Sequence, residues 1–370
     1  MKIAVLTLPF RTNYGQILQG YAMQTVLKRM GHSVEMLDEP HFAWDYYFRY
    51  PLMCLKRTCE KYILGNKDIE VFVPEHVRVR QHTQKFINEH IQRRVVRRLT
   101  SDVASEYDAF VVGSDQVWRP KYFVSRHRPM IDIAFLSFTD GCDVKRISYA
   151  ASFGTDECEY SEEQLVGCRR YLKEFDAISV REQSGVTICK ECFDANAVHV
   201  LDPTMLLSAD DYLSLIPEGY PASKGDMLVY VLDETEQVKT YIEEISSKKG
   251  LTPFRVYAEQ KVENGKPKKG IQPPVEQWLQ GFKDAKLVVT DSFHACVFAI
   301  IFHKPFICLG NKNRGMSRFD SLLNMFDLDN LDEGQNSIDW QKVDDILCRK
   351  KNESILFLSN VLNANQKREI

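Results

Sequence analysis

Short apolar segments recur along the chain, separated by longer segments whose apolar residues are spaced as on one face of a helix. This alternation is typical of an α/β fold, because a parallel strand buried on both faces is apolar throughout and is usually followed by a helix. The expected strands are 2–8, 33–37, 109–112, 146–150, 177–180, 198–201, 226–231, 254–257, 287–290 and 306–309. The expected helices are 15–30, 162–174, 182–189, 236–247, 274–283, 292–302 and 317–326.

The 370 residues exceed what one hydrophobic core usually holds, so we expect two domains. The turn-forming residues that mark the junction are Pro217, Gly219, Pro221 and Gly225. We predict an N-terminal domain of residues 1–222 with a helical insertion near 42–98. The C-terminal domain is 223–370, and its last helix is expected to pack back on the first domain. A cleft between two such domains is the usual place for a ligand.

The charge of the chain is nearly balanced, with 48 basic and 51 acidic residues and a formal net charge of −3. A general attraction to nucleic acid is therefore excluded, and an anionic ligand must be held by a local cluster.

No apolar run reaches the roughly 18 residues of a membrane span. The N-terminus enters a strand pattern too early for a signal peptide, so a cytoplasmic protein is expected. The basic run 93–98 could contact anionic lipid at the inner face of the membrane, although such runs are usually only solvated.

Five motifs stand in order along the chain. They are NYG at 13–15 with LQGYA at 18–22, VVGSDQVW at 111–118, ISVRE at 178–182, LDPT at 201–204 and TDSFH at 290–294. Together they resemble the polysaccharide pyruvyl transferase family. The resemblance implies two Rossmann-like lobes facing across a cleft, similar to the GT-B glycosyltransferase architecture. It also implies transfer of a pyruvyl group from phosphoenolpyruvate to a sugar of a surface polysaccharide or its lipid-linked precursor, with no metal and no further cofactor.

One motif departs from the family. Much of the family has Ser-Arg-Leu-His, with the Arg at the phosphoenolpyruvate site, where this chain has DSFH at 291–294. The missing cation must then come from another segment, and the stretch after 306–309 offers Lys312, Arg314 and Arg318. We predict Asn311, Arg314 and Arg318 as donor-binding residues, with a solvated basic loop as the competing interpretation. For Lys312 we favour the solvated basic loop over donor binding.

The donor chemistry also needs a group that transfers protons near neutral pH. His294 lies one turn into a helix that begins where an apolar strand ends, which is the ligand-binding edge of a parallel sheet. We predict it as catalytic together with Asp291, against a histidine hydrogen-bonded in the core. Ser292 would bind the donor at the helix N-terminus, although helix capping explains Asp291 and Ser292 about as well. Arg181 follows another apolar strand and is predicted to bind the donor, the alternative being an ion pair with a neighbouring glutamate.

Two loops are predicted to bind the acceptor sugar through amide, hydroxyl and carboxylate groups beside aromatic rings. The residues are Asn13, Tyr14 and Gln16 in the first loop, and Ser114, Asp115, Gln116 and Trp118 after the strand at 109–112. Helix capping by Asn13 or Asp115 is the competing account.

Two other functions compete with pyruvyl transfer. One is a glycosyltransferase of the same architecture that uses a nucleotide sugar, and the other is a non-catalytic relative that binds a glycan. The chain has no G-x-G-x-x-G, P-loop, H-E-x-x-H or G-x-S-x-G motif, which argues against dinucleotide, nucleoside triphosphate, metalloprotease and α/β-hydrolase chemistry.

Overall fold

The computed structural model describes residues 1–38, 55, 58–59, 63, 75–123, 131–258, 260–263, 266–309, 316–328 and 338–364. The predicted insertion near 42–98 is therefore described only in part. Its described end contains two helices and a strand rather than helices alone. They are α3 (Glu75–Val79), α4 (Gln81–His90) and β3 (Arg93–Val95).

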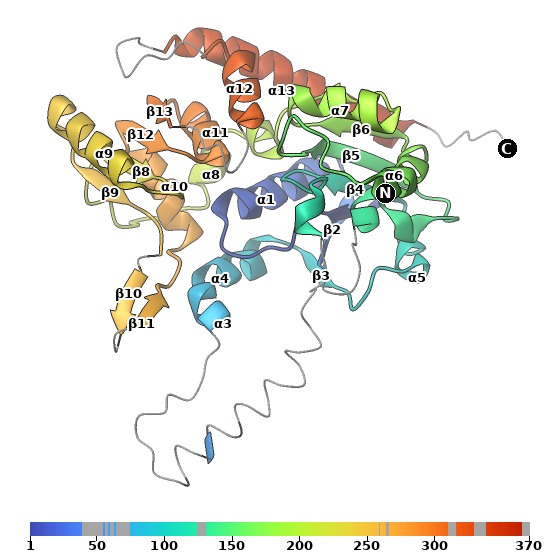
Figure 1. The fold of residues 1–370 in the computed structure, drawn as a ribbon, viewed down its shortest axis with the longest axis horizontal. Coiled ribbons are helices and arrows are strands. Elements are labelled where there is room, and N and C mark those ends of the chain that lie inside the picture. Colours follow the sequence, from blue (N-terminus) through green and yellow to red (C-terminus); the bar gives the residue numbers. More distant parts are fainter. Residues whose placement is uncertain are drawn as a thin grey trace.

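Seven parallel strands form the sheet of the first lobe, in the order β3-β2-β1-β4-β5-β6-β7 (Figure 1). The other strands are β1 (Lys2–Leu6), β2 (Ser33–Asp38), β4 (Ala109–Gly113), β5 (Lys145–Ala151), β6 (Ala177–Val180) and β7 (Val198–His199). Its other helices are α1 (Tyr14–Arg29), α5 (Ser101–Ala104), α6 (Glu162–Leu172), α7 (Gln183–Phe193) and α8 (Ala209–Leu213). Since β1 pairs with both β2 and β4, the strand order reverses direction there, as in doubly wound folds.

The second lobe has a smaller parallel sheet in the order β13-β12-β8-β9. Its strands are β8 (Met227–Tyr230), β9 (Pro253–Arg255), β12 (Leu287–Thr290) and β13 (Phe306–Cys308). Its helices are α9 (Glu236–Lys249), α10 (Val275–Asp284), α11 (Phe293–Ile301) and α12 (Ser317–Met325). Two parallel sheets, each covered by helices, confirm the predicted α/β fold class.

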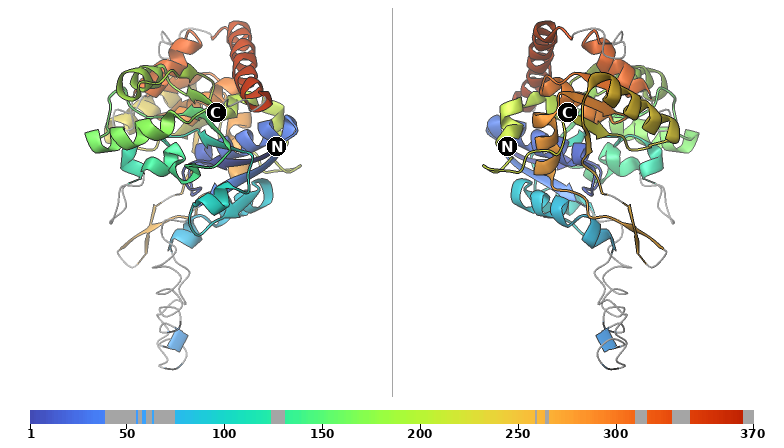
Figure 2. Two further views of the ribbon diagram at one scale, coloured as in Figure 1. Left: turned by 90° about the vertical axis from the view of Figure 1, so that its right-hand side faces the viewer. Right: turned by 90° about the vertical axis from the view of Figure 1, so that its left-hand side faces the viewer.

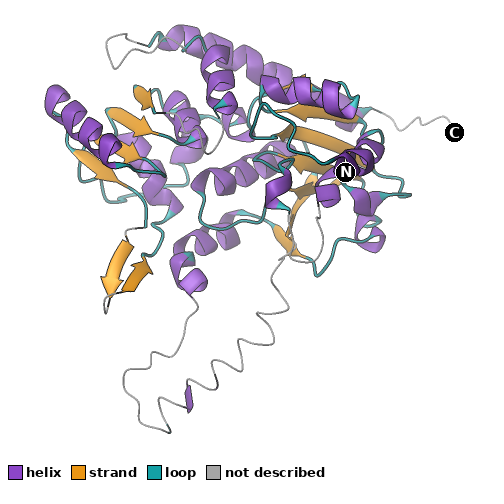
Figure 3. Ribbon diagram, in the orientation of Figure 1, coloured by secondary structure: helices purple, strands orange, loops and turns teal. Residues whose placement is uncertain are grey.

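Two strands were not predicted in the second lobe. β10 (Gln260–Glu263) and β11 (Lys266–Lys269) form an antiparallel hairpin that projects from the lobe in Figure 3. Its sequence is rich in lysine and contains Pro267, so it lacks the apolar run by which a buried strand is recognised. Strand β3 was also not predicted, because it begins with two arginines and lacks an apolar run. Both arginines form ion pairs, Arg93 with Asp38 at 2.8 Å and Arg94 with Glu106 at 2.7 Å.

One hydrophobic cluster extends across both lobes. A single buried cluster contains Ile3 and Val111 of the first sheet together with Leu228 and Val288 of the second. The first turn of α1 contributes Tyr14, which stacks on Trp278 of α10 with ring centroids 5.4 Å apart. Burial of aromatic surface at this junction holds the lobes together.

The last helix, α13 (Trp340–Asn363), runs from the second lobe to the first (Figures 1 and 2). Near its start, Trp340 stacks on His303 of the second lobe, with centroids 5.0 Å apart. At its end, the Lys145 ammonium of β5 donates to the carbonyl oxygens of Val361 and Leu362 at 2.7 and 3.2 Å. Within the described ranges, no helix is long and apolar enough to cross a membrane.

Candidate functional site

Polar residues from both lobes meet where the strands of the two parallel sheets end. Arg181 follows β6, Asp202 follows β7, and His294 lies in the first turn of α11, which follows β12. All three side chains are buried, each less than a tenth exposed. The carboxyl ends of parallel strands meet at one sheet edge, which explains how residues far apart in the sequence converge here.

Asp202 is the centre of this cluster. Its Oδ1 accepts hydrogen bonds from the backbone N–H and the hydroxyl of Thr204 at 3.0 and 2.7 Å. Its Oδ2 accepts from Ser114 Oγ at 3.2 Å and from Arg181 Nη1 at 2.9 Å, and it lies 3.6 Å from Nε2 of His294. Burial alone would raise the pKa of the Asp202 carboxyl, but His294, Arg181 and Thr204 together lower it well below its usual range.

Arg181 supplies a positive charge with unused donors. Burial opposes its charge, yet Asp202, Glu182 and Asp115 outweigh burial and raise the pKa of the Arg181 guanidinium. Nε of Arg181 lies 3.9 Å from Oε2 of Glu182, which is the ion pair that the alternative interpretation predicted. Among the residues that the structure describes, neither Nε nor Nη2 has a hydrogen-bond partner. A buried donor without a partner is costly, so these atoms are candidates for contacting a ligand.

A second arginine reaches the same place from α12. The guanidinium carbons of Arg181 and Arg318 lie 4.5 and 5.7 Å from the ring centroid of Phe293. Burial and the nearby charge of Arg181 lower the pKa of Arg318 to about 10. Two guanidinium groups buried beside one another are the arrangement expected of a site for an anion.

Contacts between α12 and the first lobe bring Arg318 to Arg181. The hydroxyl of Ser321, one turn beyond Arg318, accepts a hydrogen bond from the backbone N–H of Gln183 at 3.1 Å. Nε2 of His199 lies 3.5 Å from the same hydroxyl and 2.9 Å from the carbonyl oxygen of Arg181. Burial lowers the pKa of His199, which favours a neutral imidazole in this bridge.

The N-terminus of α11 faces the same cluster through Phe293 and His294. Ser292 is the N-cap residue of this helix, and its side chain makes no capping hydrogen bond within the described chain. The capping alternative for Ser292 is therefore not realised. The first N–H groups of α11 and the half-buried Ser292 hydroxyl remain suited to an anion.

The Asp291 carboxylate holds a loop of the second lobe. Its carboxylate accepts the backbone N–H groups of Leu232 and Asp233, at 2.7 and 3.1 Å, in the loop after β8. The carboxylate beside His294 is that of Asp202, which was not among the predicted site residues. The same rule that selected Arg181 applied to it, because Asp202 directly follows an apolar strand segment.

The predicted residues of the first loop have largely structural contacts. Asn13 caps α1 by accepting the N–H of Gln16 at 3.3 Å, as the capping alternative predicted. The hydroxyl of Tyr14 donates to the carbonyl oxygen of Pro273 at 2.8 Å, and its ring is fully buried between the lobes. The Gln16 amide donates to the carbonyl oxygen of Pro9 at 3.1 Å. Asn13 is the exposed member of this group.

The loop after β4 approaches the cluster with strained backbone. Ser114 and Asp115 have φ angles of 50° and 51°, the left-handed region that residues other than glycine rarely adopt. Asp115 accepts the N–H of Gln116 at 2.9 Å, and Gln116 accepts from Arg119 at 3.0 Å. This geometry aims Ser114 at Asp202.

Trp118 lies in the core rather than at a sugar site. Its ring has no exposed surface, stacks on Phe135 at 5.1 Å and donates its N–H to the carbonyl oxygen of Ala134 at 2.9 Å. A contact between this indole and a sugar would require the core to open. Asn311 and Arg314, also predicted at the site, lie outside the described residues.

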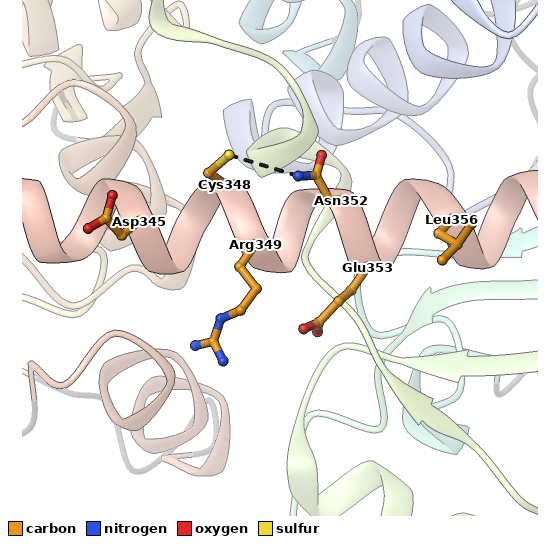
Figure 4. Close-up of a pocket in the computed structure, with 6 residues that line it drawn as sticks. All are labelled: Asp345, Cys348, Arg349, Asn352, Glu353 and Leu356. Atoms are coloured by element: carbon orange, nitrogen blue, oxygen red, sulfur yellow. Dashed lines mark hydrogen bonds between the residues drawn. The ribbon is translucent and has the colours of Figure 1, made fainter.

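A separate hollow of about 520 Å³ lies on the outer surface of α13 (Figure 4). It is lined by Asp345, Cys348, Arg349, Asn352, Glu353 and Leu356. All six belong to one helix, and none of them belongs to the cluster around Asp202. The hollow is therefore not part of the candidate site.

Several solved structures are similar to this chain in overall arrangement. UDP-GlcNAc 2-epimerase from Neisseria meningitidis bound to UDP-GlcNAc is 10% identical, with 98% of this chain and 99% of that one covered and a TM-score of 0.47. The S. aureus MnaA structure with UDP is 11% identical, with coverages of 98% and 88% and a TM-score of 0.46. Arabidopsis thaliana UGT89C1 with quercetin is 12% identical, with coverages of 99% and 95% and a TM-score of 0.44. No match was found among curated proteins.

The sequence profile of one family matches residues 13–313. This range contains the motifs in the first loop, after β4 and β6, and at the start of α11. It also contains the buried cluster of Arg181, Asp202 and His294. Because the match extends over more than half of the chain, this protein belongs to the polysaccharide pyruvyl transferase family.

Proposed function

We propose that this protein transfers a pyruvyl group from phosphoenolpyruvate to a sugar of a surface polysaccharide or of its lipid-linked precursor. The observation that carries the proposal is the buried pair Arg181 and Arg318, which meets the N-terminus of α11 beside His294. Phosphoenolpyruvate presents a phosphate and a carboxylate on a small frame. A site with two guanidinium groups and a helix N-terminus matches that charge distribution.

In the proposed donor site, Arg181 and Arg318 bind the two anionic groups and Ser292 adds a hydroxyl at the helix N-terminus. Arg318 takes the place of the family arginine that is missing from the segment 291–294. Asn311 and Arg314 stay predicted members of this site. Asp202 keeps Arg181 in place without using its Nε and Nη2 atoms.

His294 is the proposed proton-transfer group. One sugar hydroxyl adds to C2 of the donor while its C3 methylene takes a proton, so that a methyl group forms. A second hydroxyl then attacks C2, the bond from C2 to the phosphate oxygen breaks, and the proton of that hydroxyl leaves with the phosphate. The products are a cyclic pyruvate ketal with a free carboxylate and inorganic phosphate. His294 can take the proton from a hydroxyl and deliver one to C3.

The acceptor side is proposed at the loops after β1 and β4. Asn13, Gln16, Asp115 and Gln116 remain the acceptor residues of the proposal. Tyr14 and Ser114 support the site through the lobe junction and through Asp202, and Trp118 supports the loop from the core.

Binding of phosphoenolpyruvate alone tests the donor site directly. A ligand that binds only the native state raises the apparent stability, by about 2.7 kcal/mol at a hundredfold excess over Kd. We expect phosphoenolpyruvate to raise the thermal midpoint and a uridine diphosphate sugar to leave it unchanged. A rise with the nucleotide sugar alone would instead support the glycosyltransferase alternative. If neither ligand changes the midpoint, phosphate release with a diol-bearing saccharide decides between catalysis and glycan binding.

Replacing Arg318 by Gln should affect donor binding more than stability. Loss of a hydrogen bond to a charged group costs about 1.5–3 kcal/mol, so donor affinity should fall about ten- to hundredfold. The stability of the ligand-free protein should change less than donor affinity, because burial and Arg181 disfavour the Arg318 charge while Glu182 and Asp115 favour it. Thermal midpoints at several donor concentrations measure both effects.

The control for this variant is Arg29→Gln, which removes an arginine paired with Asp211 at 2.6 Å on the surface of the first lobe. It should leave donor affinity unchanged. Equal donor affinities in Arg318→Gln and the unmodified protein would show that Arg318 is not in the donor site.

A further inference from the structure

The imidazole of His294 packs against the backbone of the first turn of α1. A Cβ atom added to Gly15 would lie 2.1 Å from Cγ, 2.2 Å from Nδ1 and 2.5 Å from Cβ of His294. Side-chain carbons do not approach other atoms this closely. Gly15 belongs to the first lobe and His294 to the second, so this contact crosses the junction between them.

The backbone conformation of Gly15 does not explain the glycine. Gly15 lies inside α1, and its φ angle is not in the positive range. Alanine is favoured over glycine inside a helix by about 1 kcal/mol. The space needed by the His294 ring is therefore the physical reason for glycine at this position.

The first lobe contacts the imidazole at a second point. Oδ2 of Asp202 lies 3.6 Å from Nε2, while the Cβ position of Gly15 lies nearest to Cγ and Nδ1. The ring is thus bounded at both nitrogens by groups of the first lobe. Nε2 is buried, has no hydrogen-bond partner in the described chain, and faces the Asp202 carboxylate.

We propose that Gly15 is a positioning residue, which sets the imidazole of His294 for proton transfer across the junction between the lobes. This inference rests on the proposed function of His294. The reacting group of the second lobe is correctly placed only against α1 of the first lobe. A methyl group at residue 15 would displace the ring by more than an ångström to reach ordinary contact. A displacement of about 1 Å commonly costs about a hundredfold in rate.

The test compares Gly15→Ala with Gly20→Ala on the same helix. A Cβ atom at Gly20 would meet the ring of Phe10 at 2.5 Å, so this control adds the same methyl group against an apolar side chain. Gly15→Ala should lower kcat about a hundredfold and change the KM for phosphoenolpyruvate little. Gly20→Ala should lower stability and keep kcat within a few-fold of the unmodified enzyme.

Two measurements keep the inference testable without turnover. The ring-proton NMR signal of His294, assigned by its loss in His294→Gln, should shift in Gly15→Ala and stay in place in Gly20→Ala. If Gly15→Ala folds poorly, adding His294→Gly should raise the thermal midpoint again, because it removes both the ring and the Cβ atom of residue 294 that the added methyl group would meet. An unchanged His294 signal in Gly15→Ala, or no recovery in the double variant, would overturn the positioning role. A signal that shifts in a protein without pyruvyl transfer would overturn the proposed function alone.

Discussion

Replacing His294 by Ala should lower the rate of pyruvyl transfer by about two to four orders of magnitude, which is the range that a positioned acid or base usually contributes. In the proposed mechanism, the imidazole carries the proton at the meeting point of Arg181, Asp202 and α11. Its loss should act mainly on kcat, since Arg181 and Arg318 would still bind the donor. The measurement is phosphate release from phosphoenolpyruvate in the presence of a saccharide acceptor.

His303→Ala is the matched control for this variant. His303 directly follows the end of α11 and pairs with Asp344 on the surface at 2.8 Å, so its removal tests loss of an imidazole outside the cluster. Turnover in that variant should stay at the level of the unmodified protein. Should His294→Ala turn over normally while retaining its thermal midpoint, the proton would have to be carried by another group and the proposed chemistry would be wrong.

Much of the fold follows from the sequence because buried parallel strands are continuous apolar runs. The strand at 287–290 and the helix starting near 292 were expected almost at the observed bounds, and their junction places His294. The hairpin of β10 and β11 was missed for the converse reason. Its strands are lysine-rich and pair with each other, so no core requires apolar residues there.

The composition of the site was harder to predict than the fold. Arg181, Ser292 and His294 were singled out from strand ends, and the structure brings them together with Arg318. Asp202 was not singled out, because one carboxylate after a strand looks the same as a turn residue. Its significance depends on Ser114 and His294, each about ninety positions away in the sequence, and only tertiary packing brings them to one carboxylate.

The role of an aromatic residue also depends on packing by segments that are distant in the sequence. Trp118 stands among short polar residues in the sequence, which favours a sugar contact. Its ring is nevertheless enclosed by Phe135 and Phe153, from segments that follow it in the chain. Local sequence cannot distinguish an exposed indole from one that a distant segment covers.

The largest effect on stability is expected for Asp202→Asn, about 3–5 kcal/mol at neutral pH, because removing one partner of a buried ion pair leaves the other charge uncompensated. An amide has a single acceptor oxygen. It cannot accept from Thr204 at one atom and from Arg181 and Ser114 at the other, as the carboxylate does. Urea unfolding at pH 7 measures this loss, and Asp344→Asn, an exposed carboxylate paired with His303, should cost about 1 kcal/mol or less.

The same variant should change the pH dependence of folding in a defined direction. The pKa of Asp202 is lower in the folded protein than in the unfolded chain, where it is about 3.9. The stabilisation by the ionised carboxylate is therefore complete above that value and is lost as the pH falls towards the folded pKa. The difference in unfolding free energy between the unmodified protein and Asp202→Asn should shrink as the pH is lowered from about 5 towards 2. A difference that stayed constant over this interval would mean that Asp202 is not ionised in the fold, and the charge-paired arrangement with Arg181 and His294 would have to be replaced by a neutral one.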